Sequence, residues 1–294
     1  MTSQSPIRHY ARVMQHFAST RSLEVIALQS SPILGCFLSG FSLERSGVIR
    51  LGLLLLGSLA LTAHVFVFND WAGHSSDIRD PRRSKLAFSR RGISRRQVAR
   101  LATGLLVFAN LTFAVVGRPA VLIGAAIAVL SLLYSYSPSF GKGTPIVASM
   151  NHLLGGSLHF LLGYTLTHPL DARGFMISAF FGLVFAGGHL NQEVRDYEGD
   201  LLSGIRTSAV VFGCRRTFLA SLCMFTAAYA ILASLAALGI LPRPLLWSVI
   251  LWLLHMSWSL QAIQRGLGFE TALWMRRRYR LLFAFIGLAM LVRA

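Results

Sequence analysis

Long apolar runs, separated by short polar segments, recur along the whole chain. Nine of them are candidate membrane spans, and they cover residues 24–42, 47–68, 99–117, 119–137, 144–166, 174–192, 217–240, 243–263 and 280–293. A helix needs about 20 apolar residues to cross a hydrocarbon core of about 30 Å. Prolines, which interrupt helices because they lack a backbone N–H, stand at several boundaries, including Pro119, Pro145 and Pro242. The pattern predicts an all-α integral membrane protein, a bundle of about nine transmembrane helices.

The composition agrees with a membrane protein throughout. Charged residues make up only 13% of the chain, against roughly 25% in soluble domains. The apolar runs leave no stretch for a separate soluble domain, so we expect a single domain over residues 1–294. Residues 1–22 mix basic and apolar positions without a cleavage site, and this pattern indicates an amphipathic helix that lies on the membrane surface.

The basic residues predict the orientation. The net charge of +17 is not spread as in a nucleic-acid-binding protein, because the Lys and Arg residues lie between the apolar spans. With nine spans, 22 of the 28 Lys and Arg residues fall on the side of the N-terminus and 6 on the other side. The positive-inside rule then places the N-terminus in the cytoplasm. We expect a bacterial inner-membrane protein that binds membrane lipid and no nucleic acid.

Most of the acidic residues gather in two clusters. The chain has 11 acids, and seven of them follow the second and sixth predicted spans: Asp70, Asp77, Asp80, Glu193, Asp196, Glu198 and Asp200. Both clusters belong to segments that we expect to face the cytoplasm, residues 71–98 and 193–216. A single carboxylate at a helix end is usually a cap or a partner of arginine, but two clusters on one membrane face favour a functional site.

Helical spacing groups the carboxylates further. Asp70 and Asp77 are seven residues apart and would share one helix face, as would Glu193, Asp196 and Asp200. Grouped carboxylates require a cation, and such oxygen ligands suit Mg²⁺, which is usually completed by substrate phosphates. Basic residues that can bind phosphate oxygens flank both clusters, among them Arg79, Arg83, Arg195, Arg206 and Lys142. The combination predicts a site for a diphosphate on an apolar tail.

At these residues the chain resembles the UbiA superfamily of intramembrane prenyltransferases. The first cluster reads Asn-Asp-Trp-Ala-Gly-His-Ser-Ser-Asp over residues 69–77 and is similar to the family's NDxxDxxxD motif. The second reads Arg-Asp-Tyr-Glu-Gly-Asp over residues 195–200 and contains the DxxxD motif. The Gly-x-Arg-Thr-x-Ala-Val stretch at 204–210 and the Leu-Tyr-Ser-x-Ser-Pro stretch at 133–138 are also similar to the family. The resemblance extends over nearly the whole chain.

The resemblance implies a nine-helix bundle around a central cavity, in which two Mg²⁺ ions bind a prenyl diphosphate. By motif position, Asn69, Asp70 and Asp77 would hold one ion, and Asp196 and Asp200 the other, with Glu193 as a further ligand. The four aspartates would carry catalysis. The substrate-binding residues would be Lys142, Arg206, Arg79, Arg195, Arg21, Tyr134, Asn151 and His189. The reaction would transfer the prenyl group to a small acceptor, expected to be aromatic.

One departure from the family motif leaves alternatives open. The middle aspartate of the first motif is replaced by Gly73, so one metal ligand is missing and the first metal site would be weakened. Two other functions stay compatible with the sequence. One is a terpene cyclase of the same family that acts on a prenyl diphosphate alone. The other is a catalytically silent relative that binds or transports lipid.

Overall fold

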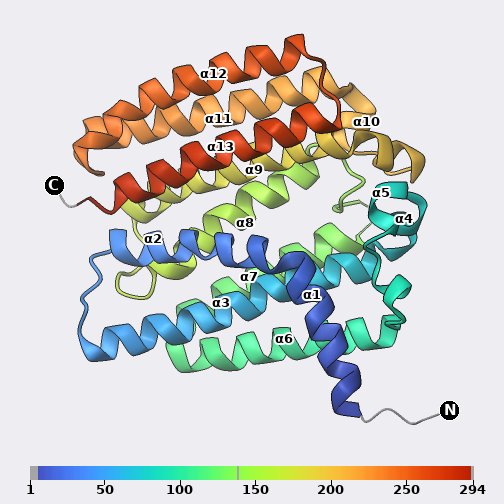
Figure 1. Cartoon of the computed structure of the whole chain (residues 1–294). Helices are drawn as coiled ribbons and strands as arrows, with labels where there is room; N and C mark the ends of the chain where they lie inside the picture. Colours follow the sequence, from blue (N-terminus) through green and yellow to red (C-terminus); the bar gives the residue numbers. More distant parts are fainter. Residues whose placement is uncertain (1–5, 138, 293–294) are drawn as a thin grey trace.

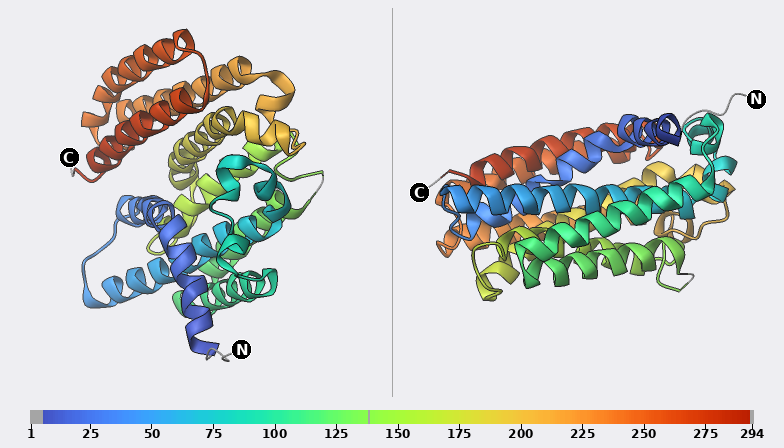
Figure 2. Two further views of the ribbon diagram at one scale, coloured as in Figure 1. Left: turned by 45° about the vertical axis from the view of Figure 1, so that its right-hand side comes forward. Right: turned by 90° about the horizontal axis from the view of Figure 1, so that it is seen from below.

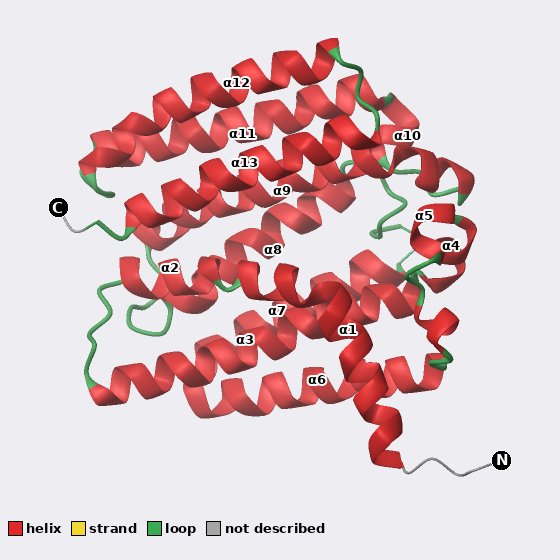
Figure 3. Cartoon of the chain, viewed as in Figure 1, coloured by secondary structure: helices red, strands yellow, loops and turns green. Residues whose placement is uncertain are grey.

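The computed structural model describes residues 6–137 and 139–292, and within these ranges every regular element is a helix (Figure 1; Figure 3). The α-helices are α1 (Pro6–Leu28), α2 (Ser30–Leu38), α3 (Arg45–Ala72), α4 (His74–Arg79), α5 (Pro81–Ser84), α6 (Arg95–Val116), α7 (Arg118–Tyr136), α8 (Val147–Tyr164), α9 (Ala172–Leu202), α10 (Ser208–Phe212), α11 (Cys214–Ala237), α12 (Ser248–Gln264) and α13 (Phe269–Met290). Two 3₁₀ turns, η1 (Phe88–Arg91) and η2 (Arg243–Trp247), complete them.

The predicted membrane bundle is confirmed. Six helical segments are long and apolar enough to cross a membrane, namely α3, α6, α7, α9, α11 and the unit formed by η2 and α12. The other three predicted spans correspond to α2 with the end of α1, to α8, and to α13. The long helices run side by side, and α4, α5 and α10 lie together at one end of the bundle (Figure 1; Figure 2).

The first predicted span is divided rather than continuous. Residues 24–42 include the end of α1, a break at Gln29, and α2. Pro32 explains the break, because its ring excludes the carbonyl of the residue four positions earlier, which is Leu28. The divided segment places α1 across the end of the bundle while α2 enters it (Figure 1).

The last predicted span begins earlier than the sequence suggested. Helix α13 starts at Phe269, so the basic stretch at 274–280 forms its first turns instead of a connecting loop. Two contacts hold this stretch on the bundle. Arg276 pairs with Glu24 of α1 at 3.1 Å, and the Arg278 guanidinium lies 5.5 Å from the centre of the Trp258 ring of α12.

Helix α1 packs on the bundle through a few buried side chains. Val13, His16 and Phe17 are buried, whereas Arg12 and Gln15 are exposed. The buried apolar residues pack with Val67 of α3 and with residues of α6. Helix α1 is thus attached to the same end of the bundle that carries α4 and α5.

Close helix contacts in the core depend on small residues. Helix α9 packs against both α8 and α11, and α2 crosses α8 where a Cβ at Gly163 would overlap the Pro32 carbonyl. Apolar side chains gain little from leaving lipid, so close backbone approach is an important source of stability between membrane helices. The central helix α9 reaches past the bundle to Leu202, and its last turns carry the second acidic cluster.

Candidate active site

The second acidic cluster forms one stripe on the last turns of α9. Residues 193–202 were expected in a connecting segment that faces the cytoplasm, and in the structure they continue α9. The 3- and 4-residue spacing of Glu193, Asp196 and Asp200 therefore does place them on a common face, as predicted. The three side chains are largely buried, with exposed fractions of 3%, 10% and 2%.

The first acidic cluster is bent at the position of the missing aspartate. Helix α3 ends at Ala72 and α4 begins at His74, so Asp70 and Asp77 lie on different helices rather than on one face of a continuous helix. The bend falls at Gly73, whose N–H donates to the Asn69 carbonyl at 2.8 Å and whose carbonyl accepts from the Asp77 N–H at 3.0 Å. Asp70 pairs with Arg21 of α1, whose Nε lies 3.1 Å from Oδ2.

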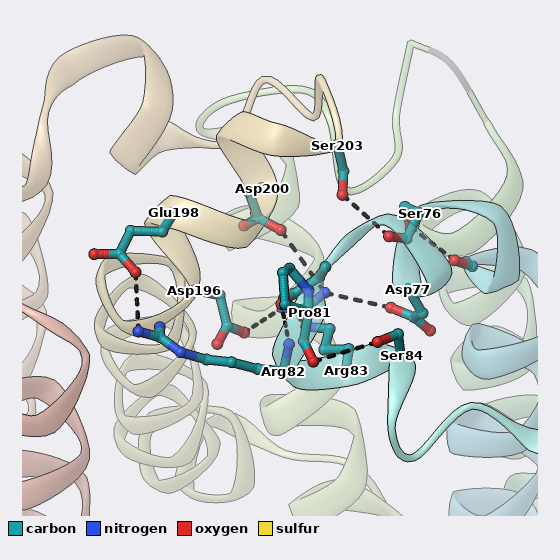
Figure 4. Close-up of polar contacts among 12 residues, drawn as sticks. Ser76, Asp77, Pro81, Arg82, Arg83, Ser84, Asp196, Glu198, Asp200 and Ser203 are labelled. Carbon is teal, nitrogen blue, oxygen red and sulfur yellow. Dashed lines mark hydrogen bonds and ion pairs between the residues drawn. The ribbon is translucent and has the colours of Figure 1, made fainter. Parts of the chain in front are cut away.

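The two clusters meet at the side chain of Arg83 (Figure 4). Its guanidinium lies 2.6 Å from Asp196 Oδ2 and 3.8 Å from Asp200 Oδ1, both on α9. On its own side of the site it lies 3.5 Å from Asp77 Oδ1 and 3.5 Å from Asp80 Oδ2. A single cation therefore joins four carboxylates from both clusters.

The segment that carries Arg83 is fixed against α9. Asp80 accepts a hydrogen bond from the Arg82 N–H at 2.8 Å, and Pro81 occupies the first turn of α5, as is favourable at a helix start. The Asp80 carboxylate packs on Gly199, where any Cβ would overlap it. The Ser203 hydroxyl adds a 3.1 Å hydrogen bond to the Ser76 carbonyl. These contacts fix the segment that carries Arg83 on the end of α9.

The electrostatics of this cluster are coupled. Burial opposes the charge of Arg83, but the surrounding carboxylates, led by Asp196 and Asp200, outweigh burial and raise the pKa of its guanidinium. Burial raises the pKa of the Asp77 carboxyl, and the positive charges of Arg83 and Lys142 counteract only part of this effect. Carboxylates outnumber the cations that contact them, so the site has room for additional positive charge.

Lys142 reaches the second cluster from the connection between α7 and α8. Its Nζ lies 3.4 Å from Asp200 Oδ1, an atom that is buried and makes no hydrogen bond. The Lys142 N–H donates to the Tyr134 carbonyl at 2.8 Å, and Asn151 Nδ2 donates to the Phe140 carbonyl at 2.9 Å. Asn151 therefore holds the connection that presents Lys142. Pro138, the last residue of the predicted motif, lies outside the described residues.

The donors fit a Mg²⁺ ion that is shared with a substrate. Within residues 6–137 and 139–292 no three His, Cys, Asp or Glu side chains converge as a complete metal cage. Mg²⁺ seldom uses such cages and is usually held by one or two carboxylates plus substrate phosphates. The carboxylates of Asp196 and Asp200 supply that kind of donor set.

A group of aromatic rings lies one turn below the carboxylates. The rings of His152 and His189 stack with centres 3.8 Å apart, and Tyr134 meets both edge-on at 4.9 and 5.9 Å. His189 Nε2 lies 3.1 Å from Glu193 Oε1. Helices α7, α8 and α9 thus bring these rings together directly beneath the acidic stripe.

Several predicted site residues have other surroundings. Glu193 Oε2 accepts a hydrogen bond from the Ser208 N–H at 2.9 Å, and Glu193 thereby anchors the start of α10. Arg195 binds Asp196 in a bidentate manner at 2.7 and 2.8 Å. Arg79 and Arg206 are exposed and form no ion pair within the described residues, and Asn69 makes no side-chain hydrogen bond there.

The sequence analysis named Arg83 only as one of several flanking basic residues and did not predict its central position. No sequence signal marks it as the centre of the site, because its position depends on the turn between α4 and α5 at Asp80 and Pro81. An apolar cavity of about 270 Å³ lies elsewhere, between α8, α9, α10 and α11, with Arg216 at its edge, and none of the clustered carboxylates lines it.

Comparison with known proteins identifies the architecture. The fold matches a UbiA homologue from Archaeoglobus fulgidus bound to GPP and Mg²⁺, with a TM-score of 0.71, 18% identity, and 96% of this chain and 99% of that chain covered. It also matches a UbiA homologue from Aeropyrum pernix K1 in its apo form, with a TM-score of 0.71, 17% identity, and 90% and 96% coverage. A third match is digeranylgeranylglyceryl phosphate synthase, with a TM-score of 0.68, 16% identity, and 95% and 97% coverage.

No curated protein sequence matches the chain significantly. The model of the UbiA prenyltransferase family, however, matches residues 33–289. This range includes α3 to α12, all but the last residue of α13, both acidic clusters, Arg83 and Lys142. The chain belongs to the UbiA prenyltransferase family.

Proposed function

We propose that this protein transfers a prenyl group from a prenyl diphosphate to a small nucleophilic acceptor, expected to be aromatic, within the membrane and with Mg²⁺. The observation that carries the proposal is the group of four carboxylates around Arg83, with Lys142 beside Asp200, at one end of an apolar bundle. The structurally similar archaeal UbiA homologue bound to GPP and Mg²⁺ supports the assignment of the donor and the metal.

In this proposal the charged end of the bundle holds the diphosphate. Mg²⁺ bound with Asp196, Asp200 and Asp77 would neutralise the diphosphate and favour its departure. Lys142 and Arg83 would donate hydrogen bonds to its oxygens, and Arg206, which is exposed at the start of the segment before α10, would reach it from the rim. The C–O bond breaks with its electron pair on the diphosphate, which leaves an allylic carbocation at the end of the apolar tail.

The rings of Tyr134, His152 and His189 lie where this carbocation would form. The face of the Tyr134 ring would supply cation–π stabilisation without a nucleophilic charge. The acceptor attacks the carbocation and then loses a proton, which restores its aromatic ring. Arg21 contributes less directly, because its ion pair with Asp70 connects α1 to the first cluster.

Two alternatives make different predictions. A terpene cyclase of this family would form product from a prenyl diphosphate alone, whereas a transferase requires an acceptor. A silent lipid-binding or transport relative would form no product. Asp196 and Asp200 are buried, close to one another and paired with Arg83 and Lys142. Such a group of buried charges favours an enzyme, because a site that only binds lipid does not require it.

The proposal is tested by incubation of the purified protein with Mg²⁺, a panel of prenyl diphosphates and mixed acceptors, followed by mass spectrometry. We expect a product whose mass equals acceptor plus prenyl group minus one hydrogen. A cyclised or eliminated prenyl hydrocarbon in reactions without acceptor would support the cyclase instead. The absence of any product with every donor and acceptor would contradict both enzymes.

We further propose that the acidic clusters face the cytoplasm of a bacterial inner membrane. The excess of Lys and Arg on this side of the bundle supports the orientation. Exposed basic side chains next to the site, such as Lys85 and Arg206, would also attract an anionic substrate.

A further inference from the structure

Arg83 occupies a position that would suit a metal ion. It lies between the two acidic clusters, within 4 Å of carboxylates from both, and its side chain remains 27% exposed. Its Nε, Nη1 and Nη2 atoms each lie within 4 Å of a carboxylate oxygen, and the exposed part of the side chain is accessible to a ligand. A planar guanidinium can bind carboxylate and phosphate oxygens together, as a bridging cation does.

The missing side chain at Gly73 also affects the first acidic cluster. A Cβ built at Gly73 would lie 3.7 Å from Asp77 Oδ2 and 3.1 Å from the Asn69 carbonyl oxygen. A side chain at this position would thus start beside Asp77, at the first cluster. The chain has lost the one carboxylate that would join Asp77 there, and in the same site it has a buried arginine that contacts Asp77.

The missing carboxylate at Gly73 and the guanidinium of Arg83 both make the first cluster less negative. Without the carboxylate, the first cluster offers Asp77 and the arginine-bound Asp70. Asp80 is not free for a metal, because it caps α5 and packs on Gly199. A second metal ion at this cluster would have few ligands and would lie close to the positive charge of Arg83.

We propose that Arg83 takes the place of one of the two metal ions and binds the diphosphate directly, so that this protein uses a single Mg²⁺ held by Asp196 and Asp200. The inference rests on the proposed function, since it assumes a prenyl diphosphate at this site. Arg83 is then a catalytic residue, because its guanidinium touches the leaving diphosphate and stabilises the charge that develops on it.

The test compares four proteins: the wild type, Arg83→Gln, Gly73→Asp with Arg83→Gln, and Arg82→Gln. Arg82 is the matched control, because it is adjacent to Arg83 but half exposed, pairs with the exposed Glu198, and covers the Phe269 ring at 4.3 Å. Calorimetric titration with an unreactive thiolo analogue of geranyl diphosphate gives its affinity and the number of Mg²⁺ ions bound with it. Turnover is measured in parallel.

We expect the wild type and Arg82→Gln to bind the analogue with one Mg²⁺. Arg83→Gln should lower the affinity by about 10- to 100-fold, which corresponds to the loss of a charged hydrogen bond. The double variant should bind two Mg²⁺ ions and recover much of the affinity. Arg83→Lys, which keeps the charge but not the planar geometry, should lie between the wild type and Arg83→Gln and serves if Arg83→Gln does not fold.

Two results would overturn the inference. One is a wild type that binds two Mg²⁺ ions. The other is an Arg83→Gln variant that binds Mg²⁺ and the analogue as tightly as the wild type, which would make Arg83 a placeholder that leaves when the metal arrives. Failure of the proposed function is distinguishable, because the wild type would then bind no analogue at all and form no product.

Discussion

Asp200 and Glu198 lie two residues apart near the end of α9, yet their surroundings are very different. The Asp200 side chain is 2% exposed and has Lys142 Nζ at 3.4 Å, whereas that of Glu198 is 65% exposed and pairs with Arg82. Surface ion pairs contribute little to stability or function. The position of a carboxylate relative to Arg83, and not its presence in the acidic cluster, therefore decides its role.

We predict that Asp200→Asn lowers turnover of a prenyl diphosphate by about 100-fold or more, since it removes one oxygen of the proposed metal site. Glu198→Gln should leave turnover within about twofold of the wild type. Pyrophosphate release under saturating substrate measures both, and thermal unfolding verifies that each variant is folded. Equal loss in the two variants would mean that the cluster acts only through its overall charge.

His74 gives the site region a pH-dependent stability. Burial, and then the positive charge of Arg95, lower the pKa of His74, although Asp77 opposes them. The ring stacks on Phe88 with centres 4.1 Å apart. The unfolded chain therefore takes up a proton near the ordinary pKa of 6.5, before the folded protein does, and stability is lost as the pH falls below that value.

We expect the thermal unfolding midpoint of detergent-solubilised protein to fall between about pH 8 and about pH 5. In His74→Gln the fall should be smaller, because the group that titrates is gone. His16, whose pKa is likewise lowered, first by burial, contributes a separate part of the fall in both proteins. The same pH dependence in wild type and variant would show that His74 is not buried against Phe88.

At the scale of residues, the sequence was sufficient to find the carboxylates but not their partners. Asp196 and Asp200 share a face of α9 as their spacing predicts, whereas Asp77 reaches the same arginine from a separate helix. The position of Arg83 between the two clusters could not be predicted, because the short helices α4 and α5 and the turn at Asp80 determine where its side chain points. The partner of Glu193, the Ser208 N–H, could not be predicted either, since it depends on the path of the chain after α9.

Among the helices, the contact of α2 with α8 depends most clearly on a missing side chain. A Cβ at Gly163 would overlap the carbonyl of Pro32. Gly155 lies on the same helix, and a Cβ there would meet nothing within 4 Å. The two glycines therefore form a matched pair for testing this contact.

We predict that Gly163→Ala destabilises the protein by about 1–3 kcal/mol through overpacking, and lowers the unfolding midpoint by several degrees. Gly155→Ala should leave the midpoint unchanged or raise it, because alanine favours the helix. Thermal unfolding in detergent measures both. A midpoint of Gly163→Ala equal to that of Gly155→Ala would mean that α2 does not pack closely on α8.

The sequence predicted the helices better than their interruptions. Apolar length identified the spans because a membrane requires it, but hydropathy does not register a break inside an apolar run. The break at Gln29 follows from Pro32, and the bend at Gly73 falls where the first motif departs from its family. Both interruptions position the active-site end: the first turns α1 toward Asp70, and the second turns Asp77 toward Arg83.

For the whole molecule, the distribution of charge predicts a single orientation. The site end carries α4, α5 and α10, while η2 lies at the other end of the bundle (Figure 1). In a protein whose native cysteines are replaced by alanine, an impermeant maleimide should label Arg243→Cys in bacterial spheroplasts. It should label Lys85→Cys only after the membrane is opened. The reverse labelling would contradict the proposed orientation.

The overall architecture was predictable because span number, charge bias and motif placement each constrain it independently. The structure confirms a helical membrane bundle, with six candidate spans among the described residues, and the family match covers residues 33–289. The acceptor was not predictable, because a pocket is shaped by side chains from several helices, and the sequence does not show which of them come together.

The central claim is that the acidic clusters bind a prenyl diphosphate with Mg²⁺ and promote its ionisation. The most direct measurement is pyrophosphate release from geranyl diphosphate by the purified protein in the presence of acceptors, with Mg²⁺ added and then removed by a chelator. We predict release with Mg²⁺, its loss on chelation, and its recovery when Mg²⁺ is restored. Release that continues undiminished after chelation, or no release with Mg²⁺ under any condition, would contradict the claim.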